Sequence, residues 1–539
     1  MFYWKEFYIW VLLTLPAIPM NTFLFLIIFL IPLISSAQSN DPYFTKGVEL
    51  FGNKDYNGAI EYFTKEIELN PNNAEAYNYK GIIKAQQGDY SGAIDVFTKE
   101  IAINPNADLA YSNRGYAKLA LHDFKGCVAD CDHAIAINPK NTKAYTNRGN
   151  SKNGMGDFNA AIQDFNKIIE LVPTDATAYV NRGNSKNALT DYKGGLEDLN
   201  KAIEMDAKIP EAYLDRGIAK GKLKDSYGAI DDFGKAIALN PDLAAAYMYR
   251  GLQKCDFNNY SDALTDFNQA ITINPKYEEA YELRGETNSK LGNYGTAGND
   301  LTKAIILNPE DAAAYYNRAQ VELKLDDNDS AIKDFTKATT LKNDFAEAYH
   351  DRGVTKLSMN DFMGAIDDLS RAIIFMPQSA SAYLNRAVAR LQLHKNTDAM
   401  ADLNKAISLD TAYSSAYFYR AAIYMETNNL KAAIRDLDKA IAGNFNLPFA
   451  YLMRGYAYTG VKNNTRALDD FTKAIALNPS NAGAFTARGR VYFSLNNKIA
   501  AKADWAKAAA LGDREAALLL KFPPTKPKPN TGNWVVWKK

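Results

Sequence analysis

Residues 210–243 read PEAYLDRGIAKGKLKDSYGAIDDFGKAIALNPDL, and related stretches recur along most of the chain. The tyrosine of this stretch, Tyr213, has an aromatic counterpart every 34 residues, without an insertion or deletion. The aromatic residues in this series are Tyr43, Tyr77, Tyr111, Tyr145, Tyr179, Tyr213, Tyr247, Tyr281, Tyr315, Tyr349, Tyr383, Tyr417, Tyr451 and Phe485. A strict period of this length indicates a solenoid, in which each unit packs only on its neighbours.

Each unit has a regular pattern of small and large residues. With Tyr213 as position 4, positions 8, 20 and 27 are mostly Gly or Ala, and position 24 is mostly Phe or Leu. Small residues let two helices approach closely, and large residues fill the space between them. Asp225 marks a turn at position 16, and Pro241 at position 32 ends the second helix. The pattern predicts two antiparallel helices per unit, each of about 14 residues and roughly 20 Å.

The pattern resembles the tetratricopeptide repeat family over residues 40–515. The resemblance implies an all-α fold, an α-solenoid of fourteen helix-turn-helix repeats wound into a right-handed superhelix. It also implies a concave groove that binds proteins or peptides, with no catalytic residues and no cofactor. The first and second helices of each repeat are called helix A and helix B below.

Two charged positions vary together along the repeats. Position 7 is Arg and position 23 is Asp in repeats 3 to 14. In repeats 1 and 2 both positions change, and Glu66 and Glu100 stand one helical turn beyond position 23. This covariation predicts contact between helices A and B, through partly buried ion pairs that fix the register. Representative expected pairs are Arg114 with Asp130, Arg216 with Asp232, and Arg352 with Asp368.

Lysine forms a second charged series at position 11. It occupies that position in repeats 2 to 7, from Lys84 to Lys254, and again at Lys356. The series is either a solvated face balanced by nearby acids or a basic stripe for an anionic ligand. Because 62 basic residues balance 62 acidic ones, we favour the first interpretation. The neutral net charge also argues against a nucleic-acid partner.

In the family, positions 2, 5, 6, 9, 12 and 13 of helix A face the groove. Polar residues recur at these positions, and the predicted peptide-binding residues are Asn113, Asn147, Asn150, Asn153, Asn181, Asn184, Asn187, Asp215, Asn317, Asp351 and Asn385. A carboxamide donates and accepts hydrogen bonds, so it can hold a peptide backbone without reading side chains. The row is similar to the asparagine ladder of O-linked N-acetylglucosamine transferases, which holds extended peptides. The alternative is that Asn at position 6 recurs only through repeat duplication.

Two further features bear on the ligand. A carboxylate clamp like that of chaperone-binding repeats needs cations where this chain has Thr146, Glu211 and Asp215, so an amine, a basic peptide or plain backbone fits better. Apolar residues at groove positions near the two ends either face a partner or pack against neighbouring helices. They are Phe44, Phe51, Tyr316, Leu384, Phe418, Leu452 and Phe493.

The N-terminal segment predicts export. Residues 7–34 carry no charge, and Ser35-Ser36-Ala37 offers small residues for cleavage after Ala37. A start at Met20 would give a signal peptide of ordinary length. An uncleaved membrane anchor within residues 1–37 is the alternative, because the apolar run is long enough to span a bilayer. We expect a periplasmic or extracellular protein whose only contact with a membrane would be an uncleaved N-terminus.

The C-terminal segment continues beyond the last repeat. Leu519 is the next residue in the 34-residue series, and residues 516–522 are predicted to form a capping helix. Residues 523–539 form a Pro- and Lys-rich tail that carries Trp534, Val535, Val536 and Trp537, which either dock on the solenoid or bind something else.

Residues with reactive side chains are sparse. The three cysteines lie within repeats, where Cys127 and Cys131 are expected to be buried apolar residues and not metal ligands. The four histidines have no nucleophile arranged around them in the sequence, and no phosphate-binding loop occurs. The sequence thus favours a non-catalytic interaction scaffold for a protein or peptide. A membrane-anchored assembly factor for an envelope complex is the alternative, and an enzyme is a weaker one.

Overall fold

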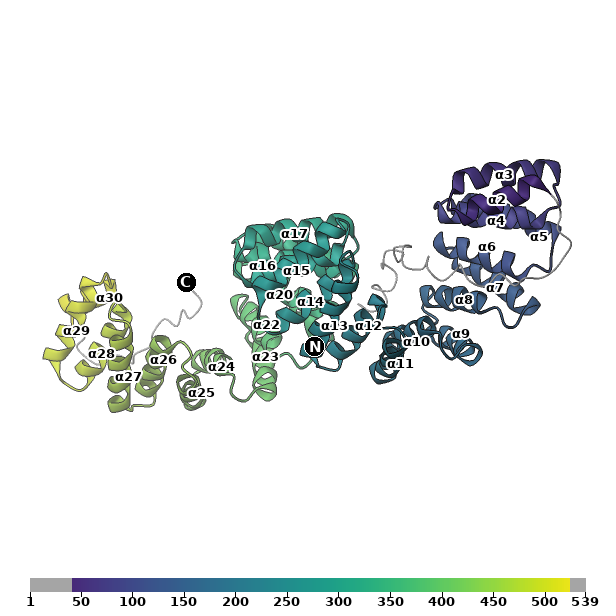
Figure 1. Cartoon of the computed structure of the whole chain (residues 1–539). Coiled ribbons are helices and arrows are strands. Elements are labelled where there is room, and N and C mark those ends of the chain that lie inside the picture. The colour runs from purple at the N-terminus through teal and green to yellow at the C-terminus, as the bar shows by residue number, and fades with distance from the viewer. Residues whose placement is uncertain (1–40, 524–539) are drawn as a thin grey trace. The chain divides into compact units, whose positions relative to one another are not determined.

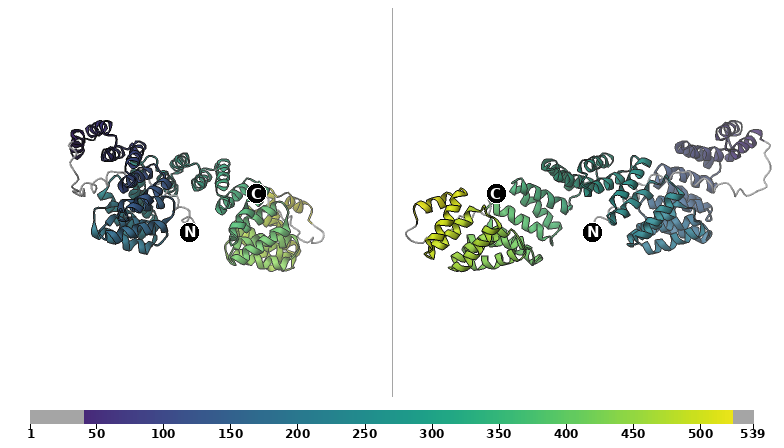
Figure 2. Two further views of the ribbon diagram at one scale, coloured as in Figure 1. Left: turned by 90° about the vertical axis from the view of Figure 1, so that its right-hand side faces the viewer. Right: turned by 60° about the vertical axis from the view of Figure 1, so that its left-hand side comes forward.

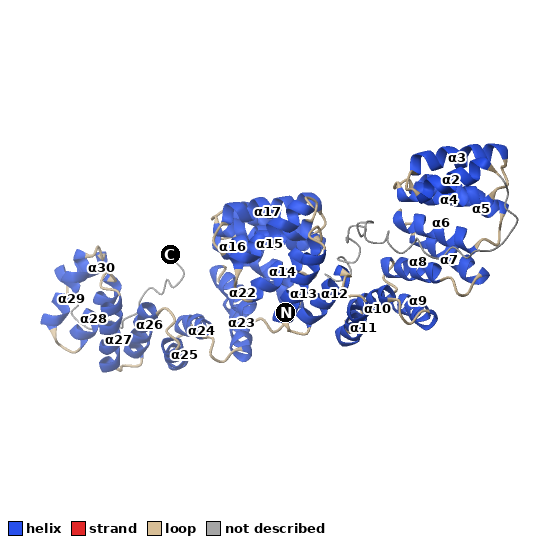
Figure 3. Cartoon of the chain, in the orientation of Figure 1, coloured by secondary structure: helices blue, strands red, loops and turns tan. Residues whose placement is uncertain are grey.

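The computed structural model describes residues 41–523, which form helices and loops without a strand (Figure 3). Successive helix pairs follow one another along the chain (Figure 1), and two further views show the same succession (Figure 2). The prediction of an all-α chain of paired helices is confirmed for these residues. Residues 1–40 and 524–539, including the predicted signal peptide and most of the tail, lie outside the described residues.

Helix A opens each repeat. The fourteen A helices are α2 (Pro42–Gly52), α4 (Ala74–Gln86), α6 (Asp108–Ala120), α8 (Thr142–Gly154), α10 (Ala176–Ala188), α12 (Pro210–Lys222), α14 (Ala244–Asp256), α16 (Glu278–Lys290), α18 (Ala312–Lys324), α20 (Ala346–Ser358), α22 (Ala380–Gln392), α24 (Ser414–Glu426), α26 (Leu447–Gly460) and α28 (Ala482–Ser494).

Helix B follows after a short turn. The B helices are α3 (Tyr56–Leu69), α5 (Tyr90–Ile103), α7 (Phe124–Ile137), α9 (Phe158–Leu171), α11 (Tyr192–Met205), α13 (Ser226–Leu239), α15 (Tyr260–Ile273), α17 (Tyr294–Leu307), α19 (Asn328–Leu341), α21 (Phe362–Phe375), α23 (Asn396–Leu409), α25 (Leu430–Ala442), α27 (Asn464–Leu477) and α29 (Lys498–Ala510). A last helix, α30 (Arg514–Lys521), packs on α29.

The small and large positions meet between the two helices of a repeat. A Cβ atom added to Gly217 of α12 would lie 2.6 Å from Cε1 of Phe233 on α13, and Phe233 is fully buried. Ala229, at position 20, is also buried against this ring. The close approach of the two backbones therefore depends on a small residue at position 8.

Side-chain caps mark the start of many of the helices. Asp225 accepts a hydrogen bond from the backbone N–H of Gly228, which satisfies a free donor in the first turn of α13. The residue before it, Lys224, has a φ of 69°, so the turn between helices uses a left-handed residue. Helix B then ends at Leu239, and its C-cap residue Asn240 directly precedes Pro241.

The chain divides into two compact units, of which unit 1 ends at Thr287 and unit 2 begins at Asn288. The division falls within α16, and the two units are described separately below.

Candidate peptide-binding surface

The arginine at position 7 forms a two-pronged ion pair with the aspartate at position 23 of the same repeat. Arg216 donates from Nε to Oδ2 of Asp232 at 2.9 Å and from Nη2 to Oδ1 at 2.7 Å. The aspartate side chain is fully buried, while the arginine remains 14% exposed. Within the described residues, the same two hydrogen bonds join Arg to Asp in eleven repeats. The pairs are Arg114 with Asp130, Arg148 with Asp164, Arg182 with Asp198, Arg216 with Asp232, Arg250 with Asp266, Arg318 with Asp334, Arg352 with Asp368, Arg386 with Asp402, Arg420 with Asp436, Arg454 with Asp470, and Arg488 with Asp504.

The same arginine also reaches the preceding repeat. Nη1 of Arg216 donates to Oδ1 of Asn200 on α11 at 2.8 Å, and the guanidinium lies 5.4 Å from the ring centroid of Tyr213. Arg148 repeats the arrangement with Asp132 on α7. Each such arginine therefore joins two consecutive B helices as well as the two helices of its own repeat.

The lysines at position 11 share the same aspartates. Lys220 Nζ lies 2.7 Å from Oδ2 of Asp232, so this carboxylate binds two cations. Equivalent contacts of 2.7–2.8 Å involve Lys118, Lys152, Lys186, Lys254 and Lys356. These ammonium groups are paired within the protein, which agrees with the interpretation of a balanced face and not with a basic stripe.

Repeats 1 and 2, which have Lys at position 7, use other contacts. Lys46 binds Glu49 on its own helix, and Lys80 donates to Thr64 Oγ1 at 2.9 Å. Glu66 accepts from Asn73 instead. The ion pair between helices A and B that marks the later repeats is thus not repeated between Lys46 and Glu66.

Glu100 in repeat 2 is a buried acid without a cation. Its side chain is only 4% exposed, and its Oε2 has no hydrogen-bond partner. Burial raises the pKa of Glu100 to about 8, so the carboxyl is largely protonated at neutral pH.

Several predicted binding asparagines connect consecutive A helices in unit 1. Asn147 donates to the backbone carbonyl of Ser112 at 3.0 Å, and Asn113 donates to Asn78 Oδ1 at 3.3 Å. Farther along, Asn153 accepts from Ser185 at 2.9 Å. Each of these side chains therefore uses one of its hydrogen-bonding groups to connect neighbouring repeats.

Asn187 does not lie on an open surface. It is 3% exposed and donates to the backbone carbonyl of Asp215 at 3.1 Å. Its Oδ1 points toward Gly195 of helix B, where an added Cβ would lie 2.1 Å away. The assignment of Asn187 to the groove was wrong, because position 12 of this repeat turns toward its own helix B.

Three predicted residues on α8, α10 and α12 have side-chain donors or acceptors that make no hydrogen bond within the protein. Asn150 is half-buried and its side chain makes no hydrogen bond, and Nδ2 of Asn181 is buried without a partner. Asp215 is 9% exposed and accepts only from Asn184, at 3.2 Å. Burial raises the pKa of Asp215 to about 7, helped by the neighbouring carboxylate of Glu211. We call Asn150, Asn181, Asn184, Glu211 and Asp215 the polar surface of repeats 4–6.

In unit 2 the predicted residues belong to a joint between repeats 9, 10 and 11. Asp351 accepts from Tyr316 at 2.8 Å and from Gln320 at 2.5 Å, while its other oxygen lies 2.8 Å from His350 Nδ1. Asn385 Nδ2 lies 3.4 Å from His350 Nε2. Asn317 is half-buried on α18.

His350 also has a hydroxyl neighbour that sequence reasoning missed. Ser381 Oγ lies 3.3 Å from Nε2, opposite the contact of Nδ1 with Asp351. The carboxylate of Asp351, the imidazole of His350 and the hydroxyl of Ser381 thus lie in the same order as the groups of a Ser-His-Asp triad. However, Asn385 shares the imidazole nitrogen and Tyr316 shares the acid, so these groups serve the joint between repeats. The separation of 31 residues between His350 and Ser381 hides this contact in the sequence.

Most of the apolar residues named at the groove positions pack inside the protein. Leu384 is 7% and Phe418 is 2% exposed. Phe44 and Phe51 contact the ring of Tyr79 with centroid distances of 6.0 and 5.2 Å. Of the two interpretations left open by the sequence, packing against neighbouring helices holds for these residues.

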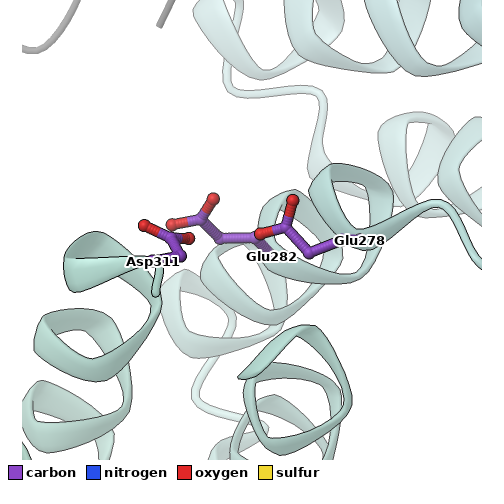
Figure 4. A group of neighbouring side chains, drawn as sticks. All are labelled: Glu278, Glu282 and Asp311. Carbon is purple, nitrogen blue, oxygen red and sulfur yellow. The ribbon is translucent and has the colours of Figure 1, made fainter. Parts of the chain in front are cut away.

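Acidic side chains lie at the starts of α16 and α18, on either side of the division between the units. Glu278 and Glu282 lie one turn apart on α16 in unit 1 (Figure 4). Asp311 belongs to unit 2, where it caps α18 by accepting from the backbone N–H of Ala313. Acids are common in the first turn of a helix because they complement its dipole.

Two other sequence expectations concern the cysteines and membrane segments. Cys127 and Cys131 are fully buried, and their sulfur atoms lie 3.8 Å apart in the core of repeat 3. Within residues 41–523, no helix combines the length and the apolar character needed to cross a membrane.

Comparison with known proteins agrees with the repeat geometry. Tetratricopeptide repeat families match residues 44–108, 142–175, 251–292, 283–344, 380–413 and 450–481. The chain is a tetratricopeptide repeat protein. Proteins of this kind are generally non-catalytic scaffolds that take part in protein–protein interactions.

Several solved structures match this chain at low identity. The Cut9–Hcn1 structure of the APC/C matches at 15% identity, covering 88% of this chain and 95% of that chain, with a TM-score of 0.39. YrrB, described as a tetratricopeptide repeat protein with an unusual peptide-binding site, matches at 23% identity over 35% of this chain and 97% of its own, with a TM-score of 0.30.

A tetratricopeptide repeat protein from Parabacteroides merdae matches at 21% identity over 46% of this chain and 97% of its own, with a TM-score of 0.34. None of these similarities identifies a partner. No curated protein sequence matches this chain.

Proposed function

We propose that this tetratricopeptide repeat protein binds an extended segment of a partner protein across the polar surface of repeats 4–6. The observation that carries the proposal is the unused polar capacity of Asn150, Asn181 and Asp215 on three consecutive A helices. Asn150 can exchange hydrogen bonds with a peptide backbone, which offers a donor and an acceptor at each residue. Nδ2 of Asn181 is buried without a partner, so Asn181 would join this contact by turning its side chain toward the bound segment.

The charge of this surface favours a basic ligand. Asp215 has no cation beside it, unlike the position 23 aspartates, and Glu211 stands one turn before it on α12. A Lys or Arg side chain, or a free amine, would supply the missing charge. The bound segment is therefore expected to place a cation at Asp215.

Co-purification after crosslinking tests the proposal in cells that naturally produce the protein. Wild type should retain a partner that the double variant Asn150→Ala/Asn181→Ala loses. The variant should keep its fold, since neither side chain donates a hydrogen bond within the protein. The matched control changes two exposed asparagines, Asn106→Ala/Asn159→Ala, and should retain the partner. Equal retention by all three proteins would move the binding site away from repeats 4–6.

The cation requirement gives a pH dependence. A cation stabilises the ionised carboxylate, and Asp215 has a pKa of about 7 in the unliganded protein. Affinity for the bound segment should therefore rise with pH up to about 7 and level off above it. Asp215→Asn should weaken binding at pH 8 and remove most of this dependence. An unchanged pH profile in Asp215→Asn would exclude Asp215 as the cation site.

We also propose that the chain is exported. The support is the uncharged run 7–34 followed by Ser35-Ser36-Ala37. Mass spectrometry of the protein isolated from its own cells should give an N-terminus at Gln38. Retention of residues 1–37 in a membrane fraction would instead support the alternative, an anchored assembly factor for an envelope complex.

A further inference from the structure

The last helix, α30, is built like a helix A whose register has moved. Asp513 accepts from the backbone N–H of Ala516, just as Asn141 accepts from Ala144 at the start of α8. Ala516 is fully buried, as Ala144 is. Ala516 therefore takes the place of position 3, although the 34-residue series would assign that position to Leu518.

The shift follows from a shorter connection. In repeat 6, four residues (240–243) separate α13 from α14, whereas three (511–513) separate α29 from α30, and α29 itself ends one residue early. The structural register thus places Leu518 at position 5 and Leu520 at position 7, and Phe522 is the C-cap residue directly after the helix.

This register leaves apolar side chains in solvent. Leu518 is 60% exposed, while its counterparts at position 5 of repeats 7 and 12, Met248 and Phe418, are 0% and 2% exposed. Phe522 is 75% exposed. In the repeats, these positions are covered by helix B of the same repeat and by the following helix A. We call Leu518 and Phe522 the outer face of α30.

The residue at position 7 indicates which kind of segment can pack on the outer face of α30. Repeats 3 to 14 have Arg there, which pairs with a buried Asp on helix B. In α30 the residue is Leu520, so the helix does not offer the cation that such a B helix requires. An apolar segment fits this face better than an ordinary helix B.

We propose that the segment Trp534–Trp537 of the same chain packs on the outer face of α30. The segment reads WVVW, and the ten residues before it, PTKPKPNTGN, are polar or Pro-rich. Eleven peptide steps lead from Pro523 to Trp534, which allows a reach of up to about 38 Å. The eight residues of α30 are only about 12 Å long, so the segment reaches the whole face.

The physical gain is the burial of two exposed apolar side chains together with two tryptophans. Repeat proteins need a covered terminal repeat, because an open apolar end promotes association. Docking would also hold α30, whose eight residues are too few for a helix that is stable without tertiary contacts.

Hydrogen–deuterium exchange of the full chain tests the proposal. Amides of α30 should exchange at least tenfold faster in Trp534→Ala/Trp537→Ala than in wild type, while amides of α27 remain unchanged. The matched control Thr531→Ala/Asn533→Ala alters the polar part of the tail and should behave as wild type. Equal exchange of α30 in wild type and the tryptophan variant would overturn the proposal.

Two further measurements distinguish the occupants. In Leu518→Ser/Phe522→Ser, tryptophan emission should move to longer wavelength, and unchanged emission would contradict docking on this face. Trp505 is fully buried and packs in one cluster with α28 and α30, so the same substitutions in a Trp534→Phe/Trp537→Phe background measure its own contribution to the shift. Protection of α30 should not depend on protein concentration. Protection that appears only as the chain dimerises would show that a second copy supplies the cover and would overturn docking within one chain.

Discussion

Position 7 of each regular repeat carries one guanidinium that contacts several groups at once. Arg216 binds the buried Asp232, the preceding helix B through Asn200, and the face of Tyr213. A bidentate pair has a defined geometry, so it fixes how far helix A is rotated against helix B. Its net contribution to stability is limited by the desolvation of both ions, whereas loss of one partner leaves a buried charge.

Arg216→Ala should therefore destabilise unit 1 clearly. We expect a loss of about 2–3 kcal/mol, since Asp232 keeps only Lys220 as a counter-ion. Replacing both partners, as in Arg216→Met/Asp232→Leu, should restore much of the loss. Thermal unfolding followed by circular dichroism measures the effect, with the exposed Arg435→Ala as control. A melting curve for Arg216→Ala that overlays wild type would contradict a structural role of the pair.

Glu100 should make stability fall as pH rises. Its pKa of about 8 in the folded protein lies above the ordinary value of 4.5, so the folded state binds more protons between these values. Stability is therefore lost progressively from about pH 4.5 to about pH 8. Glu100→Gln should match wild type near pH 5 and be more stable at pH 9, by a few kcal/mol at most.

Melting temperatures across this pH range, with the exposed Glu61→Gln as control, measure the difference. A gap between Glu100→Gln and wild type that stays constant with pH would show that folding does not raise the pKa of Glu100.

At the scale of the element, the turn between helices depends on one carboxylate. Asp225 caps α13 through a 2.9 Å hydrogen bond from the Gly228 N–H. Asp225→Ala should cost about 1 kcal/mol, and Asp225→Ser should recover most of it because serine also caps helices. Chemical denaturation of the three proteins tests this, and equal midpoints for all three would show that the cap adds nothing.

The helices themselves could be predicted from the sequence because period, small residues and helix-ending prolines agree. The spacing of Arg and Asp also indicates which helices meet, and the structure joins Arg216 to Asp232. The hydrogen bonds of Asn147 and Asn187 could not be predicted, since a carboxamide fits a peptide and a neighbouring helix equally well. The register of α30 could not be predicted from the 34-residue series either, because it depends on the length of the connection between α29 and α30.

At the scale of the whole molecule, the repeats should be exchangeable units. Deletion of residues 142–175 joins Asn141 to Ala176, so Asn141 would cap α10 in place of Asp175. Arg182 would then meet Asp132 instead of Asn166, which occupies the same position of the repeat. This deletion should preserve helicity per residue, whereas deletion of residues 142–158 alone should not. Equal helicity and equal unfolding of the two deletions would contradict nearest-neighbour packing.

Site-specific photo-crosslinking tests the proposed binding surface most directly. A photoreactive phenylalanine analogue placed at position 150 lies on helix A of repeat 4, and one placed at position 159 lies on the exposed side of helix B. In cells that produce the protein, position 150 should crosslink to a partner protein and position 159 should not. Crosslinks to the partner from position 159 and none from position 150 would place the binding surface on the B helices and contradict the proposal.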